Sequence, residues 1–287
     1  MFVEHEVMSS DGLLLYYRRY PGDLRRTAVL CLPGLTRNSR DFESLATHLS
    51  STGGRTVIAP DFRGRGRSAY DSDWRNYRPE IYSRDVMALL NMAKLERVIV
   101  IGTSLGGIVG MLLARLSPDR VAGLVLNDIG PELEVTGMVR IATTAGTTRA
   151  ATTWTEAAAD ARAGNLHVYP NFSEADWMTF AHRVYRKDRS GRIIRDVDPN
   201  VGRAIREPSG APTSTVPDFW KIFHSLRGLP LLCLRGELSD FLSVETLTRM
   251  AAHHAGMQCR EIPHRGHAPT LDEPESRVAI DTFIETL

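Results

Sequence analysis

The period of the hydrophobic pattern changes repeatedly along the chain. Short continuous apolar runs occur at 27–32 ("TAVLCL"), 55–60 ("RTVIAP") and 97–102 ("RVIVIG"), and such runs are typical of strands covered on both faces. Between them, apolar residues recur at helical spacing, and Pro79 begins the most regular of these segments, 79–95. Strands that alternate with helices predict βαβ units, hence an α/β protein with a mostly parallel central sheet and helices on both faces.

The alternation is interrupted in the middle of the chain. Residues 130–217 contain helical patterns without strand patterns, one of them capped by Ser173, and they end in a Pro-rich connector at 207–217. The strand and helix rhythm returns with "LPLLCLRG" (229–236) and "MQCREIP" (257–263). We therefore expect a core domain of residues 1–129 and 218–287, opened by an antiparallel hairpin around Ser10-Asp11-Gly12, and a helical insertion of residues 130–217.

One serine lies where a predicted buried strand passes directly into a helix, in "RVIVIGTSLGGIVGMLLA" (97–114). The turn contains Gly102, Ser104 and Gly106, a G-x-S-x-G pattern whose small residues allow the strand and helix backbones to approach. The unpaired N–H groups at the helix start favour negative charge there. The pattern predicts a nucleophilic serine at the carboxyl edge of the sheet; the alternative is a Gly-rich turn with an incidental serine.

A serine nucleophile needs a base and an acid that orients the base. His267, in the loop "PHRGHAPTLDEPE" after the last predicted strand, is the preferred base, and His264 is the alternative. Asp240, in the loop after "LPLLCL", is the preferred acid. Asp128 in "LVLNDIGPE" ends an earlier strand and is its rival, with a structural role in the turn as the other interpretation.

The order Ser104, Asp240, His267 resembles that of the α/β-hydrolase superfamily of serine hydrolases, and the resemblance extends over nearly the whole chain. It implies an α/β-hydrolase fold, a nucleophile elbow at Ser104, and a cap or lid formed by the inserted residues 130–217. "LCLPGLTRN" (30–38) is similar to the family's oxyanion loop, although Pro33 replaces the usual histidine. The implied oxyanion hole consists of the backbone N–H groups of Leu35 and Leu105.

The segment "PDFRGRGRSAY" (60–70) resembles the family's D-x-x-G-x-G-x-S loop at the rim of the pocket. Its arginines, Arg63 foremost, are candidates for attracting an anionic substrate; the alternative is that they are solvated or hold the loop in place. The inserted residues contribute three aromatic pocket candidates, Trp154, Trp177 and Phe180. The helical face that contains Trp177 and Phe180 is also a candidate for packing on the main domain.

The resemblance favours hydrolysis of a carboxylic ester or lactone through an acyl-enzyme, without a metal or other cofactor. Serine at the elbow argues against the similar haloalkane dehalogenases and epoxide hydrolases, which have aspartate there. A C–C bond hydrolase of ring-cleavage diketo acids is one alternative, but Ala268 and the short "PGLTRN" loop depart from that group's pattern. A non-catalytic ligand receptor on the same fold is the other.

Composition and net charge limit which partners and which cellular location we expect. Among 287 residues the formal net charge is +1, which gives no reason to expect a nucleic-acid or membrane partner. The chain begins without the basic and apolar regions of a signal peptide, and its three cysteines lie in apolar runs. We therefore expect a cytoplasmic monomer or homodimer with buried cysteines, acting on a small-molecule ester or lactone.

Overall fold

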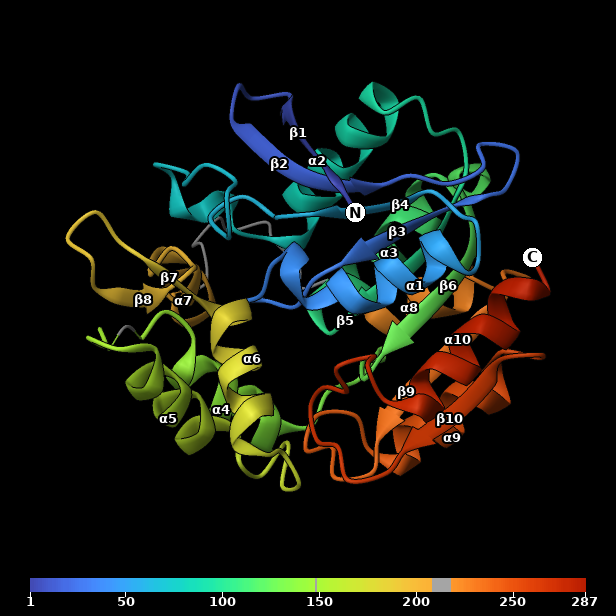
Figure 1. The fold of residues 1–287 in the computed structure, drawn as a ribbon. Helices are drawn as coiled ribbons and strands as arrows, with labels where there is room; N and C mark the ends of the chain where they lie inside the picture. The colour runs from blue at the N-terminus through green and yellow to red at the C-terminus, as the bar shows by residue number, and fades with distance from the viewer. Residues whose placement is uncertain (148, 208–217) are drawn as a thin grey trace.

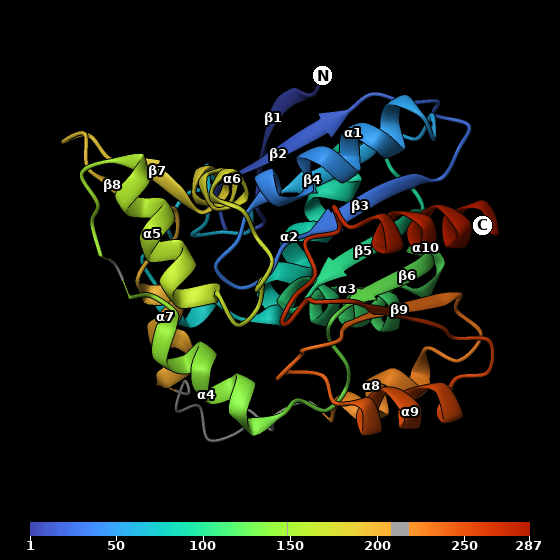
Figure 2. The same ribbon diagram turned by 60° about the horizontal axis from the view of Figure 1, so that its bottom comes forward.

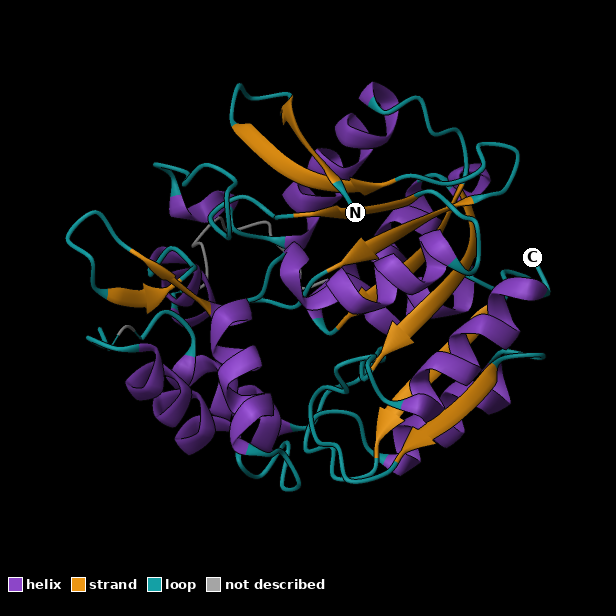
Figure 3. Cartoon of the chain, in the orientation of Figure 1, coloured by secondary structure: helices purple, strands orange, loops and turns teal. Residues whose placement is uncertain are grey.

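The centre of the protein is a single eight-stranded sheet. The computed structural model describes residues 1–147, 149–207 and 218–287. The sheet has the order β1-β2-β4-β3-β5-β6-β9-β10, and its pairs from β4 to β10 are parallel, which confirms the predicted mostly parallel sheet (Figure 1, Figure 3). The strands are β1 (Val3–Met8), β2 (Leu14–Tyr20), β3 (Ala28–Leu32), β4 (Val57–Pro60), β5 (Val98–Thr103), β6 (Val121–Asn127), β9 (Leu231–Gly236) and β10 (Gln258–Ile262).

Helices cover both faces of this sheet, as the alternating pattern predicts. One face packs against α2, α3, α8 and α9, and the other against α1 and α10 (Figure 2). The apolar runs of β3, β4 and β6 are buried throughout, because every side chain on these strands contacts one of the two layers. The helices are α1 (Glu43–Ser51), α2 (Pro79–Met92), α3 (Leu105–Leu116), α8 (Phe219–Ser225), α9 (Val244–His253) and α10 (Pro274–Glu285).

The two edges of the sheet differ. At one edge β1 pairs antiparallel with β2, which confirms the predicted hairpin. At the other edge β10 pairs only with β9 among the described residues, and most of its side chains are exposed. The expectation of three buried cysteines is therefore wrong for Cys259, which lies on β10 and is exposed, whereas Cys31 and Cys233 are buried.

The described residues between β6 and α8 form a separate layer beside the carboxyl ends of the strands (Figure 1, Figure 2). We call this layer the cap. Its elements are α4 (Val135–Thr144), α5 (Trp154–Asn165), α6 (Glu174–Val184), β7 (Tyr185–Lys187), β8 (Ile193–Arg195) and α7 (Asn200–Arg206). The predicted Ser173 cap is confirmed as a capping box with Asp176. The connector predicted at 207–217 lies, from residue 208 on, outside the described residues.

The expectation of an insertion without strands is wrong, because β7 and β8 form an antiparallel hairpin. The helical pattern of "SEADWMTFAHRVYRKD" stops at Val184, and the turn that follows is closed by Asp188, whose Oδ1 accepts from the N–H groups of Ser190 and Arg192. Gly191 completes the turn with φ of +83°. The turn lets Tyr185–Lys187 pair with Ile193–Arg195, and this strand pairing replaces the helix that periodicity alone would extend.

Most of the apolar face of α6 packs inside the cap, and Phe180 also contacts Arg37 of the main domain. Trp177 and Phe180 on this face belong to one buried cluster with Ala157, Ala161 and Tyr169. The ring centroids of Trp177 and Tyr169 lie 6.1 Å apart in an edge arrangement. The cap therefore has a small hydrophobic core of its own, which holds α5 against α6.

Candidate active site

Ser104 lies on the tight turn between β5 and α3. Its φ of 51° falls in the left-handed region, which is unusual for a residue other than glycine. The flanking glycines are required by close backbone contacts: a Cβ on Gly102 would lie 2.4 Å from the Gly106 carbonyl oxygen, and one on Gly106 would lie 2.1 Å from the Leu32 carbonyl oxygen. The glycines of the G-x-S-x-G pattern therefore allow a geometry that raises the serine above the sheet edge.

His267 reaches Ser104 from the loop between β10 and α10. Its Nε2 lies 2.8 Å from Ser104 Oγ, and its side chain is only 6% exposed. The imidazole stacks on Phe241, with ring centroids 4.0 Å apart. The structure thus brings together the two sequence-predicted residues with the geometry of a hydroxyl and its proton acceptor.

Asp128 occupies the place beside His267 for which the sequence favours Asp240. Its Oδ2 lies 2.8 Å from His267 Nδ1, and the residue is fully buried. Asp128 directly follows β6 and adopts φ of 56°. Gly236 N–H donates to its Oδ1 at 2.9 Å and Ser239 Oγ donates to its Oδ2 at 2.7 Å. Because a carboxylate only accepts, it fixes the tautomer with the proton on Nδ1 and leaves Nε2 to accept from the serine.

Asp240 is held by the cap and makes no hydrogen bond to His267, which corrects the preferred acid. Arg140 on α4 binds its two carboxylate oxygens through Nε and Nη2, each at 2.7 Å. Burial alone would raise the pKa of Asp240, but these bonds outweigh it and hold the pKa below its ordinary value. The sequence held one usable signal: Asp128 comes immediately after a strand, whereas Asp240 lies four residues beyond β9.

Two backbone N–H groups lie close to Ser104. Leu35 follows Gly34 on the loop after β3, and Leu35 and Ser104 line the same cavity. Within the described part of the chain the Leu35 N–H has no hydrogen-bond acceptor, and Leu105, as the first residue of α3, has no intrahelical acceptor. Among the described residues, both donors therefore lack an acceptor.

The buried side chain of Arg65 braces the loop after β3. Its Nε donates to the Leu35 carbonyl oxygen at 2.7 Å, and its Nη1 donates to the Arg63 carbonyl oxygen and the Tyr82 hydroxyl. The residue has no exposed surface. A contact between the loops after β3 and β4 thus fixes the peptide next to the Leu35 N–H.

Arg63 is structural, which corrects its expected place in the substrate pocket. Its side chain is 1% exposed and binds Asp85 through Nε and Nη2, and Asp71 and Asp11 through Nη1. The hydrogen bond from Arg63 lowers the pKa of Asp11 to about 2. Three carboxylates from separate segments are thereby joined beneath the loop after β4.

We expect Arg63→Met to lower the free energy of unfolding by about 3–5 kcal/mol, because it leaves buried carboxylates without their counter-charge. Urea denaturation followed by circular dichroism measures the change. Arg67→Met is the matched control: Arg67 belongs to the same loop, is 55% exposed and pairs with Glu4. Arg67→Met should lower the free energy of unfolding by less than about 1 kcal/mol. Equal losses in the two variants would contradict the structural role of Arg63.

Ser104 opens onto a cavity of about 180 Å³ between the main domain and the cap. Of the predicted pocket aromatics, Phe180 lines this cavity, whereas Trp177 is buried in the cap core and Trp154 stacks on His182 at 3.9 Å. Tyr169 was not predicted; it lines the cavity and donates to the Ala268 carbonyl oxygen at 2.9 Å. The other main lining residues are Gly34, Leu35, Thr36, Arg37, Asp41, Phe42, Thr103, Arg140, Ile141, Thr144, Arg183, Arg195, His267, Pro269 and Thr270.

In residues 1–147, 149–207 and 218–287, no three His, Cys, Asp or Glu side chains are grouped as metal ligands would be. No helix of these same ranges combines the length and the hydropathy that crossing a bilayer requires.

The chain matches known proteins over most of its length. Residues 29–281 match the model of the alpha/beta hydrolase family. A 3-hydroxybutyrate-oligomer hydrolase from Cupriavidus necator is 30% identical over 96% of this chain and 94% of its own. An esterase from Mycobacterium tuberculosis is 27% identical over 88% of this chain and 80% of its own.

Solved structures agree with these matches. The crystal structure of an alpha/beta hydrolase from Novosphingobium aromaticivorans is 44% identical, with a TM-score of 0.93 over 100% of this chain and 99% of that one. The match of the family model, the similarity to full-length hydrolases and the shared fold lead to one conclusion: the chain is a member of the alpha/beta hydrolase family.

Proposed function

We propose that the protein is a serine hydrolase that cleaves a carboxylic ester through an acyl-enzyme intermediate. The observation that supports this most strongly is the continuous chain of contacts from the Asp128 carboxylate through the His267 imidazole to the Ser104 hydroxyl, with 2.8 Å at each step. Asp128 takes the acid role that the sequence favours for Asp240. The described part of the cap lines the cavity at Ser104 and encloses the acyl or alcohol group.

In the first half-reaction, Ser104 Oγ attacks the ester carbonyl carbon while His267 Nε2 accepts the hydroxyl proton. The Asp128 carboxylate offsets the imidazolium charge. The N–H groups of Leu35 and Leu105 bind the tetrahedral oxyanion, and each contributes about 3 kcal/mol in the transition state. Collapse breaks the ester C–O bond, and the alcohol leaves with the proton from His267.

In the second half-reaction, water takes the place of the alcohol. His267 removes one proton from the water as its oxygen attacks the acyl carbon, and the same proton returns to Ser104 Oγ as the acid leaves. One ester and one water thus give one acid and one alcohol. Similarity to the oligomer hydrolase makes short esters of hydroxy acids the first natural substrates to examine.

The proposal is tested with a fluorophosphonate probe and a panel of p-nitrophenyl esters and lactones. The probe should label Ser104 alone, as located by peptide mass spectrometry, and labelling should abolish hydrolysis of every ester that the protein turns over. Labelling at another residue, or turnover that survives complete labelling of Ser104, would refute the proposed nucleophile. Labelling without turnover of any ester would favour the ligand-receptor alternative.

A further inference from the structure

The cavity at Ser104 is lined by an excess of cationic side chains. Four arginines line it: Arg37, Arg140, Arg183 and Arg195. Among the described residues that line the cavity, Asp41 is the only one with a carboxylate. Arginine is the residue type best suited to binding a carboxylate, because its planar guanidinium presents parallel N–H donors.

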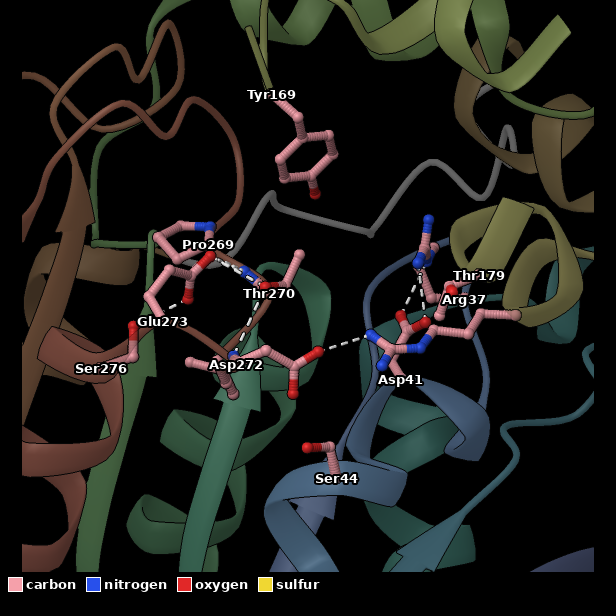
Figure 4. A network of polar contacts seen from close by, with 12 residues as sticks. Arg37, Asp41, Ser44, Tyr169, Thr179, Pro269, Thr270, Asp272, Glu273 and Ser276 are labelled. Atoms are coloured by element: carbon pink, nitrogen blue, oxygen red, sulfur yellow. Dashed lines mark hydrogen bonds and ion pairs between the residues drawn. The ribbon is translucent and has the colours of Figure 1, made fainter. Parts of the chain in front are cut away.

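Arg37 lies beside the nucleophile. A Cβ built on Gly34 would lie 3.4 Å from Arg37 Cγ and 3.9 Å from Ser104 Cβ. Arg37 donates to both oxygens of Asp41 through Nε and Nη2, at 2.7 Å each (Figure 4). Its guanidinium stacks over Phe180 at 4.3 Å, which fixes its plane. Within the described residues its Nη1 has no hydrogen-bond partner, so one edge remains for a ligand.

The other three arginines come from the cap, and each pairs with an aspartate. Arg140 pairs with Asp240 at 2.7 Å, Arg183 with Asp272 at 2.8 Å, and Arg195 with Asp160 at 3.7 Å. None of these three aspartates lines the cavity, whereas all three arginines do. The aspartates therefore orient the guanidiniums without filling the cavity with negative charge.

Burial makes this arrangement selective for an anion. The side chains of Arg37, Arg140, Arg183 and Arg195 are 20%, 24%, 18% and 21% exposed, so little water screens their charges. Each guanidinium has an aspartate partner, but only Asp41 among these partners lines the cavity, so an anion bound there meets guanidinium N–H groups and a single carboxylate. Figure 4 shows Tyr169 reaching toward the same region, between Arg37 and the Pro269–Thr270 segment.

We propose that this cavity binds a free carboxylate of the substrate, so that the protein selects esters carrying a carboxylate at the end away from the scissile bond. The inference rests on the proposed function of Ser104. It assigns the anion recognition that the sequence suggested for Arg63 to Arg37 and the cap arginines instead.

The test compares two isosteric substrates: a linear dimer of a 3-hydroxy acid with a free carboxylate, and the same dimer ending in a primary amide. The wild-type protein should show kcat/KM for the acid about 10- to 100-fold above that for the amide at low ionic strength, as expected for charge-assisted hydrogen bonds. Salt should reduce this ratio. Because the ratio compares two substrates on one protein, partial unfolding cancels from it.

Two double variants remove arginines without changing net charge: Arg37→Met/Asp41→Asn and Arg140→Met/Asp240→Asn. Each should lower the acid-to-amide ratio at least several-fold, chiefly through KM. Arg162→Met/Glu174→Gln is the control, since this pair lies on the exposed surface of the cap and neither residue lines the cavity; it should leave the ratio unchanged.

A wild-type ratio near one, or a ratio that neither cavity variant changes, would overturn carboxylate recognition while leaving the hydrolase proposal intact. If neither dimer nor any ester of the panel is hydrolysed, the proposed function fails and the inference fails with it.

Discussion

Ser104→Ala is expected to lower kcat for ester hydrolysis by about a million-fold, because it removes the only atom that forms the acyl-enzyme. The loss should appear in kcat, since the cavity walls and the two backbone donors stay in place. Alanine has no hydroxyl and is smaller than serine, so the turn between β5 and α3 should remain intact. Steady-state hydrolysis of the best p-nitrophenyl ester, with binding of a product acid measured separately, distinguishes lost chemistry from lost binding.

Ser51→Ala is the matched control for this variant. Ser51 is exposed at the end of α1, and its hydroxyl donates to the Thr47 carbonyl oxygen within the same helix. The Ser51→Ala variant should hydrolyse the ester with the same kcat as the wild type. If Ser104→Ala keeps more than a few per cent of wild-type kcat, a different group performs the attack and the mechanism proposed here is excluded.

Asp128→Asn should lower kcat about ten-thousand-fold, the size expected when the acid of a triad becomes an amide. The asparagine side chain can present an N–H toward His267 Nδ1, which reverses the tautomer and removes the acceptor that Ser104 needs. Loss of the negative charge also leaves the imidazolium uncompensated in a site where His267 is nearly buried. The measurement is kcat for one ester across a range of pH.

Asp240→Asn is the decisive comparison, because the two aspartates are the rival acids of the sequence. Its carboxylate binds Arg140, so the substitution should change kcat by less than about tenfold and act mainly on the cap. Ser239→Ala should lower kcat more than Asp240→Asn and less than Asp128→Asn, since Ser239 positions Asp128 by donating to its Oδ2. A larger loss for Asp240→Asn than for Asp128→Asn would reverse the assignment.

The sequence by itself determined the architecture and predicted two of the three residues of the proposed triad. Continuous apolar runs are typical of strands covered on both faces, and their alternation with helices predicted a parallel sheet whose carboxyl edge collects loops. The elbow serine was recognisable because Gly102 and Gly106 flank it, and those glycines are required by contacts within and next to the turn itself. His267 followed because it lies in the loop after the last strand.

Only the tertiary structure decided which acid meets His267 and which arginines face the cavity. Asp128 and Asp240 both lie after strands. The choice depends on two donors that hold Asp128 beside the imidazole: Gly236 at the end of β9 and Ser239 in the loop after it. In the sequence, Arg63 and Arg37 carry the same charge, and nothing distinguishes their roles. Burial among three carboxylates makes Arg63 structural, whereas stacking on Phe180 leaves an edge of Arg37 facing the cavity. Such roles depend on contacts between segments far apart in the chain, which local pattern does not encode.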